Sequence, residues 1–128
     1  MSSSNDRPTS PHLQIYRLPL TAVLSIGFRV AGAVLAGGLV LLVWLLVAAA
    51  SGPEYYAQVH GMAASWFGQL VLFGLTFVLY YHLCNGVRHL YWDTGRGFER
   101  ESVATSVWMV LAVSVGLTVL TWLIAFIV

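Results

Sequence analysis

Three uncharged, largely apolar runs fill most of this chain and decide how it can fold. They cover Val30–Ala50, Met62–Tyr81 and Val103–Val128. About 20 apolar residues span a hydrocarbon core roughly 30 Å thick as an α-helix. A helix is the form to expect, because it satisfies its own backbone hydrogen bonds where water is absent. We therefore predict an all-α membrane protein with three transmembrane helices.

The composition agrees with this prediction and excludes other classes. Hydrophobic residues make up 59% of the chain and charged residues 9%, whereas soluble domains carry about 25% charged residues. The net charge of +1 and the lack of lysine argue against a nucleic-acid partner. The single cysteine, Cys84, excludes an internal disulfide and a cysteine-based metal cluster. No nucleophile–base pair, phosphate loop or carboxylate dyad is visible, so the chain alone does not look like an enzyme.

Proline and glycine mark the boundaries of the predicted segments. Residues 1–20 carry three prolines, so we expect an extended segment at the membrane surface. Residues 21–128 form the predicted three-helix anchor domain. Its helices are expected at about 21–51, 61–89 and 102–128, and its loops at Gly52–His60 and about Leu90–Glu101.

The arginines gather on one side of the predicted membrane. The first loop carries Glu54 and no arginine, whereas all six arginines lie before or near the start of the first helix or in or beside the second loop: Arg7, Arg17, Arg29, Arg88, Arg96 and Arg100. The positive-inside rule then places the N-terminus and the second loop in the cytoplasm, with the C-terminus periplasmic. The N-terminal stretch lacks the arginine-rich pattern of a transit peptide. We therefore expect a multi-pass protein of a bacterial inner membrane.

Ser25 and Arg29 are the first candidate site residues. They lie four residues apart near the start of the first helix, so they share a side of it. Arg29 either reaches the interface to anchor the helix or forms a polar pocket with the Ser25 hydroxyl. Such a pocket would hold a carbonyl oxygen or a carboxylate.

His82 is the second candidate, near the cytoplasmic end of the second helix. A histidine at this depth is a packing residue, a proton relay or a metal ligand, and it is a common axial ligand of haem iron. Gly86, one turn later, leaves room for a flat ring or a neighbouring helix. His89 lies on nearly the same face, roughly 10 Å further along. Two histidines on one face cannot bracket one iron, so a six-coordinate haem requires a second chain.

Three motifs with this order resemble the cytochrome b556 subunits of succinate dehydrogenase, the larger membrane anchors of respiratory complex II. The resemblance covers the N-terminal segment, the start of the first helix and the end of the second. The motifs are Arg7-Pro8-x-Ser10-Pro11-His12-Leu13-x-Ile15-Tyr16, Ser25-Ile26-x-x-Arg29-x-x-Gly32 and His82-x-x-x-Gly86-x-Arg88-His89-Leu90-x-Trp92-Asp93-x-Gly95.

The resemblance implies a role in electron transfer from succinate to ubiquinone in the tricarboxylic acid cycle. It implies that His82 is an axial ligand of a haem b shared with a second hydrophobic anchor subunit. Ser25 and Arg29 would line the ubiquinone site, and Arg29, Arg88 or His89 would contact the haem propionates. The other implied partners are an iron–sulfur subunit, a flavoprotein subunit and membrane lipid.

One position departs from the family pattern. The family usually has histidine before the arginine of the first helix, whereas this chain has Phe28, which donates no hydrogen bond. Three alternatives stay open. The chain could be the anchor of a quinol:fumarate reductase, or a structural anchor without haem. A small transporter would instead require ionisable residues throughout the membrane depth.

Overall fold

The computed structural model describes residues 14–128 of the chain. Its helices are α1 (Leu20–Ser51), α2 (Pro53–Ala64), α3 (Trp66–Asp93) and α4 (Arg100–Ile127), and no strand occurs within the described range. α1, α3 and α4 are long and apolar enough to cross a bilayer. The predicted all-α membrane architecture with three spans is therefore confirmed.

The prediction of a loop at Gly52–His60 is wrong, because most of this segment belongs to α2. Gly52 ends α1 at φ 121°, a backbone conformation that favours glycine. Pro53 then occupies the first position of α2 and Glu54 its first turn. Proline suits this position, and an acidic side chain there interacts favourably with the helix dipole. The Gly–Pro pair therefore ends one helix and begins another, where the sequence predicted the start of a loop.

The other boundaries also move. The second span begins at Trp66, where we had expected Gly61, and it runs on to Asp93. The loop before α4 is correspondingly short and comprises residues 94–99. The Ser65 hydroxyl caps α3 by accepting a hydrogen bond from the Gly68 amide at 3.1 Å.

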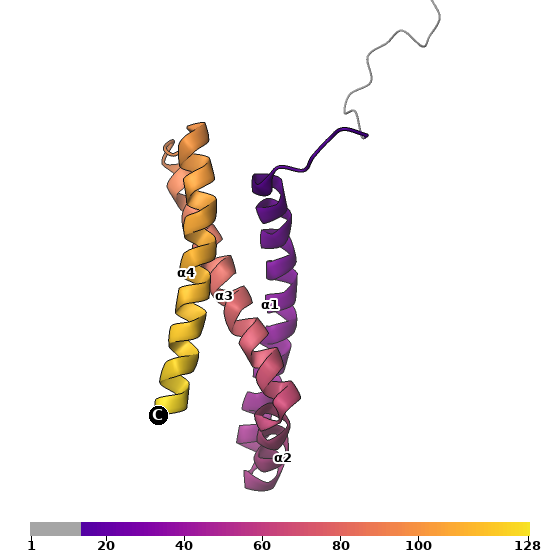
Figure 1. Ribbon diagram of the computed structural model, residues 1–128. Coiled ribbons are helices and arrows are strands. Elements are labelled where there is room, and N and C mark those ends of the chain that lie inside the picture. Colours follow the sequence, from indigo (N-terminus) through magenta and orange to yellow (C-terminus); the bar gives the residue numbers. More distant parts are fainter. Residues whose placement is uncertain (1–13) are drawn as a thin grey trace, which may run out of the picture.

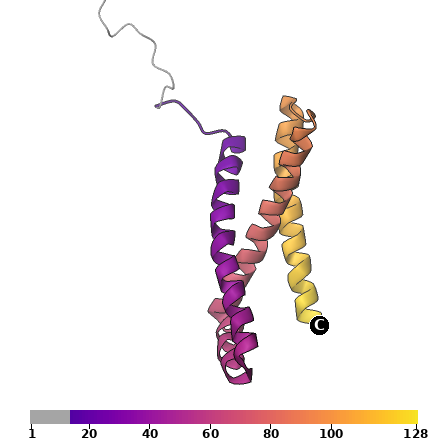
Figure 2. The ribbon, with the colours of Figure 1, turned by 180° about the vertical axis from the view of Figure 1, so that it is seen from behind.

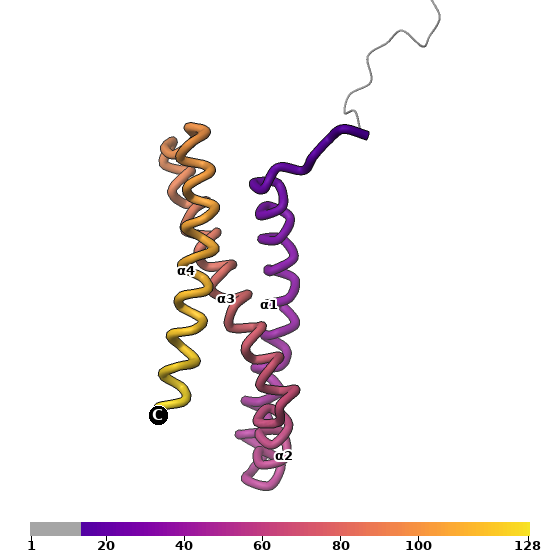
Figure 3. The backbone as a smooth tube through the Cα atoms, in the orientation of Figure 1, coloured from indigo at the N-terminus to yellow at the C-terminus, as the bar shows by residue number. Residues whose placement is uncertain are grey.

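α3 is the central helix of the bundle. It runs antiparallel to both α1 and α4 and lies between them in opposite views (Figures 1 and 2). The backbone trace in Figure 3 shows α2 folding back beside the end of α1. There the Trp44 indole donates a hydrogen bond to the Tyr55 hydroxyl at 2.9 Å. This link ties α2 to the end of the first span.

The three spans share a small buried core. Five residues form it: Leu24, Ala31, Tyr81, Val107 and Val110. Most other large apolar side chains point outward, as expected for helices surrounded by lipid and by partner helices. Lipid tails are as apolar as these side chains, so close packing and hydrogen bonds must hold such helices together.

Hydrogen bonds connect the central helix to both neighbours. The Tyr81 hydroxyl donates to the Leu24 carbonyl oxygen of α1 at 3.0 Å. The Tyr80 hydroxyl lies 2.8 Å from the Thr121 hydroxyl of α4. Because polar groups find few partners in hydrocarbon, each bond favours the native register of the helices.

The bundle has one arginine-rich end. Arg17 precedes α1, and Arg96 and Arg100 lie in or beside the loop between α3 and α4. The start of α1 and this loop lie at the same end of the molecule, and α2 lies at the other (Figure 1). The helices thus bring together arginines that are far apart in the sequence.

Gly68 is predicted to be essential for the turn between α2 and α3. A Cβ atom there would collide with the backbone carbonyl oxygens of Met62 and Ala63. We expect Gly68→Ala to destabilise the protein by roughly 1–3 kcal/mol, as overpacking does in cores. The measurement is the thermal unfolding midpoint in detergent.

Gly74→Ala is the matched control, because a Cβ at Gly74 of the same helix meets nothing within 4 Å. Equal midpoints for Gly68→Ala and the wild type would contradict the assigned backbone at this turn.

Candidate functional site

His82 points from α3 toward α1, where a glycine makes room for it. A Cβ atom on Gly32 would lie 3.3 Å from His82 Cε1, which is tighter than an ordinary contact. Glycine at position 32 therefore lets the two helices approach with the imidazole between them. The spacing of Gly32 and His82 in the sequence gives no sign of this contact.

Phe28 of α1 lies between the two histidines of α3. Its ring stacks on His82 with centroids 4.4 Å apart and planes 23° apart. It also lies 5.0 Å from the His89 ring at 30°. His82 and His89 therefore share one side of α3, and Phe28 packs against both. We name Phe28, Gly32, His82, Gly86 and His89 the histidine face.

One ring nitrogen of His82 is buried without a partner. Nδ1 has no hydrogen-bond partner within residues 14–128. A metal–imidazole bond lies in the plane of the ring, and Phe28 covers only a face of it. Stacking on Phe28 therefore does not block a bond to Nε2 in the plane of the ring.

The donor set fits one axial position of a haem. The described residues contain no group of three or more His, Cys, Asp or Glu side chains able to hold a metal ion. A metal centre built by residues 14–128 alone is thus not supported. A haem iron already has four porphyrin nitrogens, so it needs only an axial side chain, and a single histidine has the chemistry to be one.

The surface of α3 near His82 has a gap where Gly86 carries no side chain. A Cβ atom on Gly86, one turn further along α3, would meet nothing within 4 Å. A flat ring or a helix of another chain can therefore approach the histidine face at this position.

Ser25 and Arg29 flank the histidine face on α1. With about 100° per residue, they lie about 60° and 100° around the helix from Phe28, on the side of Gly32. Both are exposed. Their side chains make no hydrogen bond or ion pair with another residue of the described part. The serine and the arginine are thus available to a molecule that binds beside His82.

Arg88 lies away from the histidine face. It is about 120° around α3 from His82, and its Nε donates a hydrogen bond to the Ser106 hydroxyl of α4 at 2.8 Å. Its guanidinium carbon lies 4.1 Å from the centre of the Trp92 ring, and the residue is only 8% exposed. The expected grouping of Arg88 with His82 and His89 is therefore not seen in the isolated chain.

Two buried residues that support this region were missed in the sequence. Tyr81 bonds to the Leu24 carbonyl oxygen of α1 at 3.0 Å. Asn85, which is 1% exposed, donates to the Tyr81 carbonyl oxygen at 3.0 Å. Their spacing of four residues within an apolar helix is the signal that could have found them.

The fold and the histidine face together define the class: residues 14–128 form an all-helical, multi-pass membrane protein with histidines on one side of its central helix. Residues 3–121 match the family described as succinate dehydrogenase/fumarate reductase transmembrane subunit. The chain belongs to this family, which confirms the resemblance drawn from its motifs.

Individual relatives agree over nearly the whole chain. A succinate dehydrogenase cytochrome b556 subunit of Paracoccus denitrificans is 45% identical over 122 residues, which is 95% of this chain and 94% of the relative. The corresponding subunit of Rickettsia conorii is 40% identical over 92% of each chain. A cytochrome b560 subunit of Reclinomonas americana is 34% identical over 93% of this chain and 86% of its own length.

Ser106 is predicted to stabilise the protein through Arg88. Ser106→Ala removes the oxygen that accepts the Nε hydrogen bond. We expect a loss of about 1–3 kcal/mol, because a charged donor is left without its partner. The measurement is the free energy of unfolding in mixed micelles.

Ser102→Ala is the matched control, since Ser102 is an exposed serine of the same helix. It should change the stability by less than about 0.5 kcal/mol. Equal effects of the two substitutions would show that the bond to Arg88 adds nothing.

Proposed function

We propose that this chain is a membrane-anchor subunit of a succinate:quinone oxidoreductase, and that it binds haem b and helps form the ubiquinone site. The observation that carries the proposal is the His82 ring packed on Phe28 and Gly32, with Nδ1 buried without a hydrogen-bond partner within residues 14–128 and open space at Gly86 one turn away. Membership of the succinate dehydrogenase/fumarate reductase family supports it independently.

In this proposal His82 supplies one axial ligand through Nε2. The haem would provide a one-electron carrier next to the quinone site. Phe28 holds the imidazole by stacking at 4.4 Å, and Gly32 fixes how closely α1 approaches it. The second axial ligand belongs to a second hydrophobic anchor subunit, because His82 and His89 lie on the same side of α3.

Arg29 and His89 are proposed to contact the haem propionates. Both are exposed beside the histidine face, and both side chains offer hydrogen-bond donors. Arg88 is the weaker candidate for this role, because Ser106 and Trp92 hold its guanidinium on the α4 side. Phe28 can contribute only packing.

Ser25 and Arg29 are proposed to bind ubiquinone. The Ser25 hydroxyl donates a hydrogen bond to a quinone carbonyl oxygen. The Arg29 guanidinium stabilises the negative charge that develops on that oxygen during reduction. Their exposure beside the histidine face supports this role, since a quinone there would be close to the electron carrier.

The remaining proposals concern orientation and partners. Arg17, Arg96 and Arg100 lie at one end of the bundle, and we propose that this end faces the cytoplasm of a bacterial cell. An iron–sulfur subunit and a flavoprotein subunit dock there and deliver electrons from succinate. In this proposal the reaction requires the other subunits, and the chain alone does not catalyse it. The family description also covers fumarate reductase, but the names of the relatives favour succinate dehydrogenase.

The haem proposal predicts the optical spectrum of the purified complex. In the wild type, we expect a b-type signal in the dithionite-reduced minus oxidised difference spectrum. His82→Ala should lose or shift this signal, because the iron loses an axial nitrogen.

His60→Ala is the matched control, since His60 lies in α2, far from the histidine face, and its spectrum should match the wild type. An unchanged spectrum for His82→Ala would move the ligand elsewhere, with His89 as the next candidate. If the wild-type complex lacked the signal, this chain would be a structural anchor without haem.

The quinone proposal predicts a selective loss of activity. Ser25→Ala and Arg29→Gln should each slow succinate:ubiquinone reductase turnover by roughly tenfold to a hundredfold, because a donor to the reacting oxygen is lost. Electron transfer from succinate to a water-soluble acceptor should stay unchanged. Arg17→Gln, an exposed arginine before α1, is the control. If neither variant slowed ubiquinone reduction, the quinone site would lie elsewhere.

A further inference from the structure

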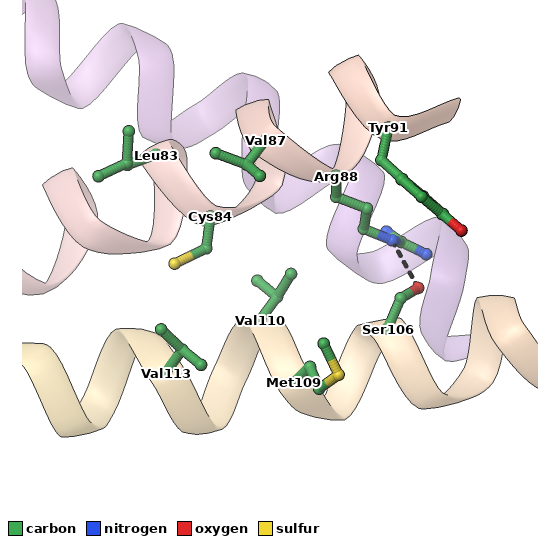
Figure 4. Close-up of a pocket in the computed structure, with 9 residues that line it drawn as sticks. All are labelled: Leu83, Cys84, Val87, Arg88, Tyr91, Ser106, Met109, Val110 and Val113. Atoms are coloured by element: carbon green, nitrogen blue, oxygen red, sulfur yellow. Dashed lines mark hydrogen bonds between the residues drawn. The ribbon is translucent and has the colours of Figure 1, made fainter. Parts of the chain in front are cut away.

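A long apolar cleft runs between α3 and α4, with a volume of about 510 Å³. Figure 4 shows its two ends: Arg88 and Ser106 at one, Leu83 and Val113 at the other. From Ser106 to Val113 the cleft follows α4 for about 10 Å. This length is about two thirds of the hydrocarbon depth of one leaflet, which is about 15 Å.

Among the described residues 14–128, the positive charge at the polar end of this cleft has only neutral partners. Arg88 bonds to the Ser106 hydroxyl at 2.8 Å and makes a long contact of 3.5 Å to the Val103 carbonyl oxygen. Trp92 covers one face of the guanidinium. Nη1 has no hydrogen bond within residues 14–128. Its donors therefore remain available where Arg88 lines the cleft.

An unpaired arginine at this depth calls for an anion. Arg88 lies about 8 Å inside the end of α3, close to the level at which lipid headgroups meet the hydrocarbon. A buried charge among apolar side chains costs free energy unless a partner compensates it. The partner must be anionic at one end and apolar beyond, because the rest of the cleft is apolar.

The cleft and the histidine face lie on different sides of α3. Cys84 and Tyr91 line the cleft, and they lie about 160° and 180° around the helix from His82. A haem or an anchor subunit seated against His82 therefore approaches from the other side of this helix. This placement argues for lipid, rather than those groups, as the occupant of the cleft.

We propose that this cleft binds one anionic phospholipid. The phosphate accepts hydrogen bonds from the Nη donors of Arg88, and one acyl chain lies along Leu83, Val87 and Val113. A net negative headgroup is favoured over a zwitterionic one, because the choline charge would lie close to an arginine with neutral partners only. Attraction of about 1 kcal/mol per basic residue corresponds to about a fivefold preference.

The test is photo-crosslinking in nanodiscs that contain the complete complex. The probes are phosphatidylglycerol and phosphatidylcholine, each with a diazirine on one acyl chain, used in separate samples. We expect phosphatidylglycerol to label peptides spanning residues 83–91 and 106–113 about fivefold more than phosphatidylcholine does. Mass spectrometry of the digested subunit measures the ratio at each peptide.

Two variants and a control test each part of the proposal. Arg88→Gln should reduce the ratio to about one. Val113→Trp fills the apolar end and leaves the charge in place, so it should reduce labelling by both lipids at these peptides. Arg96→Gln changes an exposed arginine of the nearby loop and should keep the wild-type ratio.

A wild-type ratio near one, or an Arg88→Gln ratio that stays at the wild-type value, would overturn the proposal. A haem spectrum that changes in Arg88→Gln while the lipid ratio persists would assign Arg88 to the haem instead. The labelling ratio does not depend on haem or quinone binding. Failure of the lipid site and failure of the proposed function are therefore separate results.

Discussion

The absence of water around the three spans determines what can hold this molecule together. Within a bilayer, contact between helices removes no apolar surface from water, so close packing and hydrogen bonds must hold the helices together. The buried core is accordingly small. Glycines of α1 let α3 approach, as at Gly32 against His82. Tyr81 and Arg88 then bond across to α1 and α4.

The same constraint explains why α3 carries most of the polar chemistry. As the central helix it contacts both neighbours, so its polar side chains find partners that those of an outer helix would lack. Tyr81 and Arg88 use these partners within the chain. His82 differs, because its Nδ1 is buried without a hydrogen-bond partner within residues 14–128. Its other ring nitrogen, Nε2, is the atom that we propose for a partner outside the chain.

Phe28 departs from the family pattern but still packs against the histidines of α3. The sequence suggested only that a hydrogen-bond donor had been lost. In the fold, the ring stacks on His82 and packs near His89. An aromatic ring at this position can therefore orient the imidazole without a polar atom, because stacking depends on ring contact. Propionate contacts then fall to Arg29 and His89 in our proposal.

The sequence by itself determined the three spans, the arginine distribution and the motifs that identify the family, because length, hydropathy and residue order are local properties. It also indicated that His82 and His89 share a side, since helical periodicity is local too. The start of α2 at Pro53 is also local, but a Gly–Pro pair is typical of a turn as well as of a helix start, so the sequence predicted a loop. Only the tertiary structure decided that Gly32 packs on His82. It alone also placed Arg88 toward Ser106. These outcomes depend on how helices from distant parts of the chain rotate and approach, and one-dimensional spacing does not encode that geometry.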